Sequence, residues 1–84
     1  MKYRGKVIVT LKGGVFDPQG VTIKNALHSL SFENVEEVKT GKFFEVLFCA
    51  ESDAEAEKLL KEMCRQLLAN PIIEDFSFSL EKMQ

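Results

Sequence analysis

The chain is organised around one strand-to-helix connection, Leu11-Lys12-Gly13-Gly14-Val15-Phe16-Asp17-Pro18-Gln19-Gly20. Asp17 can accept a hydrogen bond from the first unpaired N–H groups of a helix. Pro18 suits the first helical position, where its missing N–H costs nothing. Gly20 lies in the first turn, although glycine in a helix costs up to about 1 kcal/mol relative to alanine. The stretch therefore predicts a strand that ends near Leu11 and a helix that begins at Pro18.

Apolar residues alternate before this connection and recur with helical spacing after it. Val7, Val9 and Leu11 share one side of residues 6–11, which predicts a strand with one face on a core. Ile8 is an apolar residue on the outer side of the same strand. After Pro18, apolar residues at i, i+3, i+4 and i+7 predict one stripe along a helix. They are Ile23, Ala26, Leu27 and Leu30.

Two further strands are predicted in the middle of the chain. Residues 32–40 predict a second strand of irregular register, because Val35 and Val38 are three residues apart, as at a bulge or an edge strand. A tight turn is predicted around Gly41. Residues 43–50 form the most hydrophobic run, with apolar side chains on both faces. That pattern is typical of a central strand that is covered on both sides.

A second helix and a final strand complete the pattern. Ser52-Asp53-Ala54-Glu55 has the spacing of a capping box, and Asn70-Pro71 marks the end of the helix that follows. A buried stripe with three-four spacing is predicted between them. It consists of Ala56, Leu59, Leu60, Met63, Cys64, Leu67 and Leu68. Beyond it, Phe76, Phe78 and Leu80 alternate with serines and predict the last strand.

The resulting order, β-α-β-β-α-β, predicts one α+β domain over residues 1–84 with the ferredoxin-like, split βαβ arrangement. A four-stranded antiparallel sheet would carry both helices on one face. The other face would be apolar and without cover from this short chain, so we expect a second copy to cover it. That face would present Ile8, Phe43, Leu47 and Cys49.

Composition argues against several classes of protein. The net charge is −2 with both signs interspersed, which does not favour nucleic acid as a partner. No apolar run reaches the roughly 18 residues that span a bilayer, and residues 1–6 lack the apolar segment of a signal peptide. The two cysteines, Cys49 and Cys64, lie in apolar patterns and predict packed thiols in a reducing compartment.

The residues predict no catalytic constellation, cofactor site or metal site. His28 is the only histidine and has no companion ligands at metal-binding spacing. Neither cysteine has a base nearby in sequence. Gly13-Gly14 could cradle an anion, but the Asp17 carboxylate would repel phosphate there. The aromatic run from Phe43 to Phe48 lacks the positive charge that an RNA-recognition motif needs.

Several segments, in their order and spacing, resemble the PurS-type small subunit of phosphoribosylformylglycinamidine synthase. They are Leu11-Lys12, Gly14-Val15, Asp17-Pro18-Gln19-Gly20, Asn25-Ala26-Leu27-His28-Ser29-Leu30, Phe32, Val35, Val38, Gly41-Lys42, Cys64-Arg65-Gln66-Leu67-Leu68-Ala69-Asn70-Pro71 and Ile73-Glu74-Asp75-Phe76. Two positions depart from the pattern: Gly13 stands where the family often has proline, and Ser31 where it often has a helix-ending glycine.

This resemblance implies a non-catalytic subunit of a cytoplasmic enzyme of purine biosynthesis. The synthase makes formylglycinamidine ribonucleotide from formylglycinamide ribonucleotide, ATP and glutamine. The small subunit would bridge a large synthase subunit of PurL type and a glutaminase subunit of PurQ type, and would help ammonia pass between them. ATP and magnesium are expected on the large subunit. The chain alone is expected to have no activity and to form a homodimer or homotetramer.

Two surfaces are predicted to make these contacts. The larger partners would bind the connecting loop, the first helix and the turn before the central strand. Those positions are Lys12, Gly14, Asp17, Gln19, Gly20, Asn25, His28, Gly41 and Lys42. The second copy would bind the apolar sheet face of Ile8, Phe43, Leu47 and Cys49.

Two other classes fit the strand order. An ACT-type sensor would bind an amino acid or a nucleotide near Gly13-Gly14, at a junction between subunits. An acylphosphatase-like enzyme would need an arginine in its phosphate-binding loop, and the only arginines, Arg4 and Arg65, lie elsewhere.

Overall fold

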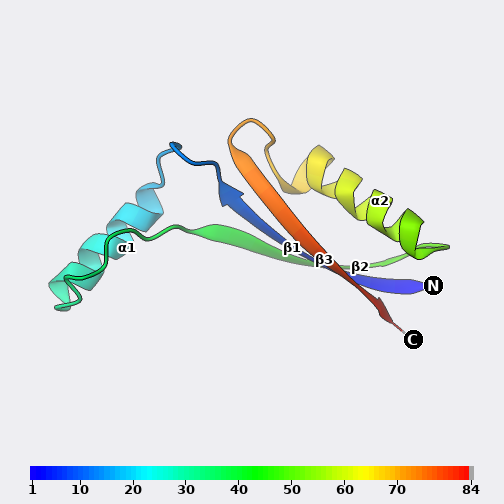
Figure 1. The fold of residues 1–84 in the computed structure, drawn as a ribbon, viewed down its shortest axis with the longest axis horizontal. Coiled ribbons are helices and arrows are strands. Elements are labelled where there is room, and N and C mark those ends of the chain that lie inside the picture. Colours follow the sequence, from blue (N-terminus) through cyan, green and yellow to red (C-terminus); the bar gives the residue numbers. More distant parts are fainter. Residues whose placement is uncertain (84) are drawn as a thin grey trace.

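A computed structural model describes residues 1–83 as a small sheet with one helix on it and a second helix beyond its end (Figure 1). Along the chain, the elements are β1 (Lys2–Leu11), α1 (Pro18–Ser29), β2 (Gly41–Cys49), α2 (Asp53–Met63), the π-helical turn η1 (Cys64–Leu68) and β3 (Glu74–Met83). The α+β class, the antiparallel sheet and the two predicted helices are confirmed.

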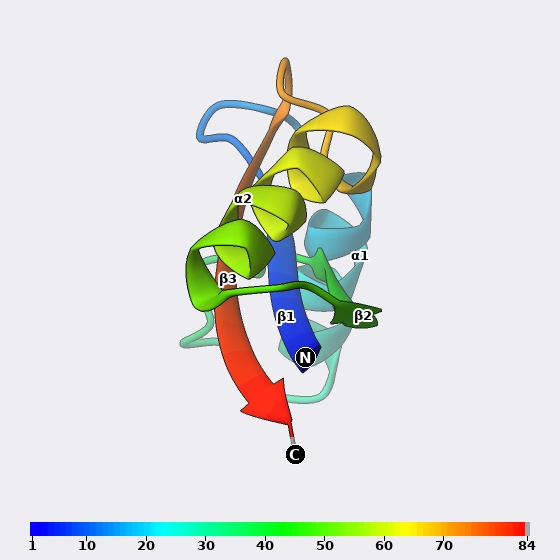
Figure 2. The ribbon, with the colours of Figure 1, turned by 90° about the vertical axis from the view of Figure 1, so that its right-hand side faces the viewer.

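The sheet is built around β1. The strand order is β2-β1-β3, and both neighbours run antiparallel to β1. Val7 lies opposite Phe44 on β2 and Phe78 on β3, so these three side chains meet on one face. That face carries α2 (Figure 2), and Val7 and Val9 are fully buried beneath it. The predicted alternation of β1 therefore places its apolar side in the core.

The start of α2 is capped by Ser52 and is held to the sheet by one tyrosine. Ser52 accepts a hydrogen bond from the Glu55 amide at 3.1 Å, as the capping pattern predicts. The Tyr3 hydroxyl donates to Asp53 Oδ1 at 2.5 Å. Halfway along, Leu60 lies directly against Gly5, where a Cβ atom would be 2.6 Å from Leu60 Cδ2. The glycine thus lets the helix approach the central strand closely.

The end of α2 departs from the predicted stripe. In η1 the Ala69 amide donates to the Cys64 carbonyl at 2.9 Å, so the hydrogen bond spans five residues there and not the four of an α-helix. The buried positions continue from Leu60 to Cys64 and then to Ala69. Leu67, which was expected in the core, is 83% exposed. That prediction is wrong because the wider turn rotates Leu67 out of the buried stripe.

The predicted strand over residues 32–40 is not formed, so within residues 1–83 the sheet has three strands and not four. The segment leaves α1 through Ser31, whose φ of 78° reverses the chain, and returns alongside the helix. The Thr40 amide donates to the Asp17 side chain and not to a neighbouring strand. The sequence pattern of an extended segment is therefore present, but its backbone does not pair with a strand of the sheet.

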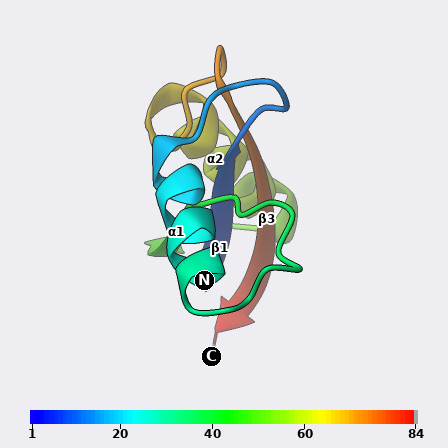
Figure 3. The ribbon, with the colours of Figure 1, turned by 90° about the vertical axis from the view of Figure 1, so that its left-hand side faces the viewer.

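The two helices do not share one face of the sheet, which corrects a second part of the predicted arrangement. Residues 17–40, called the arm below, lie beyond the end of the strands (Figures 1 and 3). The molecule measures 51 × 28 × 14 Å, and its radius of gyration is 16.6 Å. A compact chain of this length would have a radius near 12 Å. The arm accounts for this elongation.

Because the π-helical turn rotates the buried stripe, truncation of Leu60 and of Leu67 should change the free energy of unfolding by different amounts. Leu60→Ala should lower the free energy of unfolding by about 2–5 kcal/mol, because it empties a fully buried site. Leu67→Ala should change it by less than about 0.5 kcal/mol, because that side chain is exposed. Urea denaturation at one fixed protein concentration measures both. Equal losses would contradict the rotated stripe.

Candidate functional site

The base of the arm is held by one carboxylate. Asp17 Oδ1 accepts a hydrogen bond from the Gly20 amide at 2.9 Å, and Oδ2 accepts one from the Thr40 amide at 2.8 Å. The Thr40 hydroxyl also donates to Oδ2, at 2.9 Å. The bond from the Thr40 amide, followed by that from Gly20, keeps the pKa of Asp17 below its usual range, because both favour the charged form. Asp17 thus caps α1 and ties its start to the returning chain.

Gly20 has a packing role in the same place. It is buried, and a Cβ atom there would lie 2.1 Å from the Val38 carbonyl oxygen. The returning segment can therefore approach the first turn of α1 only because position 20 has no side chain. This contact within the chain accounts for a glycine in the first turn of α1.

The far end of the arm is closed by a second polar contact. His28 Nε2 lies 2.8 Å from the Val35 carbonyl oxygen, which ties the last turn of α1 to the returning segment. Ser31 between them adopts the left-handed conformation that usually favours glycine. Hydrogen bonds therefore join α1 to the returning segment near both ends of the helix.

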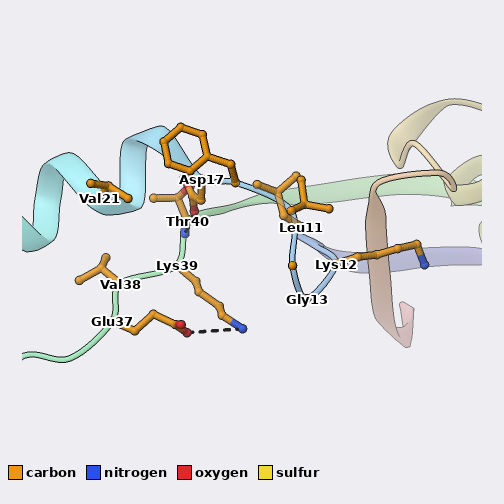
Figure 4. A pocket seen from close by; sticks show the side chains of 12 residues that line it. Leu11, Lys12, Gly13, Asp17, Val21, Glu37, Val38, Lys39 and Thr40 are labelled. Atoms are coloured by element: carbon orange, nitrogen blue, oxygen red, sulfur yellow. Dashed lines mark hydrogen bonds and ion pairs between the residues drawn. The ribbon is translucent and has the colours of Figure 1, made fainter.

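A cavity of about 410 Å³ opens at the base of the arm (Figure 4). Its apolar wall consists of Leu11, Val15, Phe16, Val21 and Val38. The charged side chains around it have partners: Lys39 lies 3.6 Å from Glu37, and Lys12 lies 2.7 Å from Asp75 on β3. The cavity is consequently better suited to apolar groups than to an anion.

The structure divides the predicted partner-binding residues into two kinds. Lys12, Gly14, Gln19 and Asn25 present accessible atoms on the loop and on α1. Asp17, Gly20 and His28 form the contacts inside the arm that are described above. Gly41 and Lys42 begin β2, and Lys42 Nζ lies 3.6 Å from Glu74. The nine positions thus extend along the loop and the arm and do not gather at one point.

The predicted self-association residues do gather on one face of the sheet, the face opposite α2. Ile8 lies directly opposite Phe43 in the ladder, and Leu47 and Cys49 follow on the same side of β2. All four are exposed. The face is not uniformly apolar, because the guanidinium of Arg4 lies 2.9 Å from Glu45 and 3.7 Å from Glu81. It is polar along β3, and along β2 it is apolar except at Glu45.

Further exposed apolar residues have no role in the predicted surfaces. Phe16 is exposed at the cavity, and Leu67 and Ile72 are each 83% exposed. Leu59, predicted in the buried stripe of α2, is exposed as well. An apolar residue between Gly14 and the cap at Asp17 was a usable signal for Phe16. The exposure of Leu67 had no such signal, because it depends on the π-helical turn.

Over residues 1–83, no group of three or more histidine, cysteine, aspartate or glutamate side chains is placed to hold a metal ion. Within the same residues, no helix combines the length and apolar character required to cross a bilayer.

Exposed apolar surface on this scale, on a chain this small, is typical of proteins that work inside an assembly. The family model of PurS, described as phosphoribosylformylglycinamidine (FGAM) synthase, matches residues 4–82. The chain therefore belongs to the PurS family.

Individual relatives agree with that assignment. A phosphoribosylformylglycinamidine synthase subunit PurS from Methanocaldococcus jannaschii is 42% identical over 82 residues, covering 98% of this chain and 99% of that protein. The crystal structure of Bacillus subtilis PurS is 44% identical, covers 95% and 99% of the two chains and has a TM-score of 0.83. A chain in the structure of PurLQS from Thermotoga maritima is 26% identical, with 96% and 99% coverage and a TM-score of 0.87.

Gly20 and Gly13 form a matched pair for testing the arm. Gly20→Ala should separate the returning segment from α1, because the new methyl group collides with the Val38 carbonyl. Gly13→Ala should have little effect, because nothing lies within 4 Å of its Cβ position. Hydrogen exchange at the Thr40 amide measures the separation. Unchanged Thr40 protection in Gly20→Ala would show that this contact does not hold the arm.

The lowered pKa of Asp17 sets the direction of a pH effect. The folded chain binds its proton more weakly than the unfolded chain, whose pKa is near 3.8, so the stabilisation is present above 3.8 and lost as pH falls further. Asp17→Asn should therefore be less stable than the native chain at pH 7. The difference should shrink below pH 3.8 in denaturation curves. A constant difference across that range would contradict the charged hydrogen bonds.

Proposed function

We propose that this chain is the non-catalytic small subunit of a cytoplasmic phosphoribosylformylglycinamidine synthase, and that it joins the larger subunits. The observation that carries the proposal is the match to PurS over nearly the whole chain. The Thermotoga relative lies in a structure whose name, PurLQS, includes two further subunits. Partners of PurL and PurQ type are inferred for this chain on that basis.

In this proposal the chemistry belongs to the partners. The PurL-type subunit uses ATP and magnesium to join ammonia to formylglycinamide ribonucleotide, and the PurQ-type subunit releases that ammonia from glutamine. The present chain, as one domain, supplies the surfaces that the partner subunits contact. The paired charges around the cavity and its apolar wall support a contact role there.

The two surfaces would have different occupants. The loop and the outer side of α1, with Lys12, Gly14, Gln19 and Asn25, would meet the larger subunits. Asp17, Gly20 and His28 would act indirectly, by holding the arm in position. Gly41 and Lys42 would set the junction between the arm and the sheet. The apolar half of the open sheet face would contact other copies in a homodimer or homotetramer. It consists of Ile8, Phe43, Leu47 and Cys49.

Reconstitution tests the proposal directly. Purified PurL-type and PurQ-type subunits from the same source should make formylglycinamidine ribonucleotide from glutamine only when this chain is added. The chain alone should show no turnover. A complex that forms and turns over equally well without the chain would contradict the bridging role. A saturable thermal shift of the lone chain with glutamine or a purine nucleotide would instead favour a sensor.

A charge reversal in the loop provides the matched variant. Lys12→Glu should reduce recovery of the large subunits in a pull-down by about tenfold, because it places a like charge beside Asp75 on that surface. Stability should change little, since the Lys12–Asp75 pair is exposed. Lys58→Glu on α2 is the control. Equal recovery with both variants would exclude the loop from the contact.

A further inference from the structure

Leu67 and Ile72 are the two most exposed large apolar side chains of residues 1–83. Each is 83% exposed, whereas the next most exposed, Phe16, is 71% exposed. Leu67 lies in η1, and Ile72 lies in the turn that joins η1 to β3. A single exposed leucine is ordinary on a protein surface, but two such side chains in one short segment mark it as a candidate contact surface.

The exposure of Leu67 follows from the π-helical turn. The Ala69 amide donates to the Cys64 carbonyl, and Cys64 packs with Val7 and Val9 in the core. Because the buried positions pass from Cys64 to Ala69, Leu67 is turned toward solvent. Turns of this kind are rare, and they occur frequently at functional sites.

The turn that carries Ile72 is held by its own hydrogen bonds. Asn70 Oδ1 accepts a hydrogen bond from the Ile72 amide at 3.0 Å, and Glu74 Oε1 accepts one from the Asn70 amide at 2.7 Å. Pro71 between Asn70 and Ile72 fixes one backbone angle of the turn. A side chain that is presented on such a constrained turn loses little conformational freedom on binding, which favours affinity.

This segment is continuous with the loop that the proposed function assigns to the larger subunits. The Lys12 amide donates to the Ile73 carbonyl at 2.8 Å, and Lys12 Nζ lies 2.7 Å from Asp75. Figure 1 shows the loop and the turn at the same edge of the molecule. A cavity of about 230 Å³ lies between them, and Lys12, Arg65 and Pro71 contribute to its wall. The loop, the cavity and the turn therefore form one surface, called the turn surface below.

The turn surface is separate from the sheet face that is proposed for self-association. Cys64 of η1 packs with Val7 on the side of the sheet that carries α2, whereas Ile8 and Phe43 lie on the opposite side. Copies that associate through Ile8 and Phe43 therefore leave the turn surface accessible. The larger subunits of the proposed complex are the remaining partners for it.

We propose that the subunit that binds the Lys12 loop also binds Leu67 and Ile72, through an apolar groove on its own surface. The two aliphatic side chains fill the groove, and Lys12 and Arg65 lie at the polar rim of the contact. The occupant is the same subunit because the hydrogen bond from Lys12 to Ile73 joins the loop and the turn into one surface. The inference rests on the proposed function and adds the position of its apolar contact.

Two variants and one matched control test this contact. Leu67→Glu and Ile72→Glu each place a charge in the proposed groove. Leu59→Glu is the control, because it places the same charge on an exposed leucine of α2 outside the turn surface. Binding to the immobilised PurL-type subunit and to the immobilised PurQ-type subunit is measured separately. We expect the first two variants to weaken binding of one of these subunits about tenfold or more, and the control to bind like the native chain.

Lys12→Glu tests whether the loop and the turn meet the same subunit. It should weaken binding of the subunit that Leu67→Glu and Ile72→Glu lose. Loss of different subunits would overturn the proposal, as would control-like binding by both turn variants. Failure of the native chain to bind either subunit would instead overturn the proposed function, and this inference with it.

Hydroxyl-radical footprinting of the native chain gives a second measurement that does not depend on any variant. The Leu67 and Ile72 side chains should be oxidised in the chain alone, also where it self-associates. In the complex with the larger subunits, their oxidation should fall about fivefold or more, because the centre of an interface excludes water. Equal oxidation in the two states would overturn the proposal. So would protection in the chain alone, which would assign the turn surface to a second copy.

Discussion

The hydrogen bonds to the Asp17 carboxylate determine where the arm lies. One oxygen accepts a hydrogen bond from the Gly20 amide in the first turn of α1. The other accepts one from the Thr40 amide in the returning chain. These two groups are twenty residues apart in sequence, so a single side chain joins the start of the helix to the start of β2. Because Gly20 lies against the Val38 carbonyl, the same point also fixes how closely the two segments approach.

The position of the arm explains the unusual surfaces of the molecule. With α1 held beyond the strands, the sheet keeps only α2 as a cover, and the half-buried side of β2 remains accessible. The opposite sheet face is left open as well, with Ile8 and Phe43 side by side. A PurS chain organised in this way has more apolar surface than its own core can cover, which agrees with a family whose relatives are named as subunits.

Local patterns in the sequence predicted the local structure well. The caps at Asp17 and Ser52 and the alternation around Val7 depend on neighbouring residues, and each element lies where its pattern places it. The strand expected over residues 32–40 failed because strand pairing needs a partner elsewhere, and the pattern of one segment does not specify one. The assignment of Asp17 and Gly20 to a partner surface stays a prediction, and the structure adds a role inside the arm for both. Proximity to Thr40 and Val38 is visible only in three dimensions.

The small core links stability to assembly. Its largest fully buried side chains are Tyr3, Leu60, Val7, Val9 and Cys64, all between the sheet and α2. The apolar stripe of α1 does not pack in the core of its own chain. Isolated helices of this length are only marginally stable in water. Any partner that covers the stripe therefore stabilises the folded arm by mass action. Binding at the stripe and the stability of the arm are therefore expected to change together.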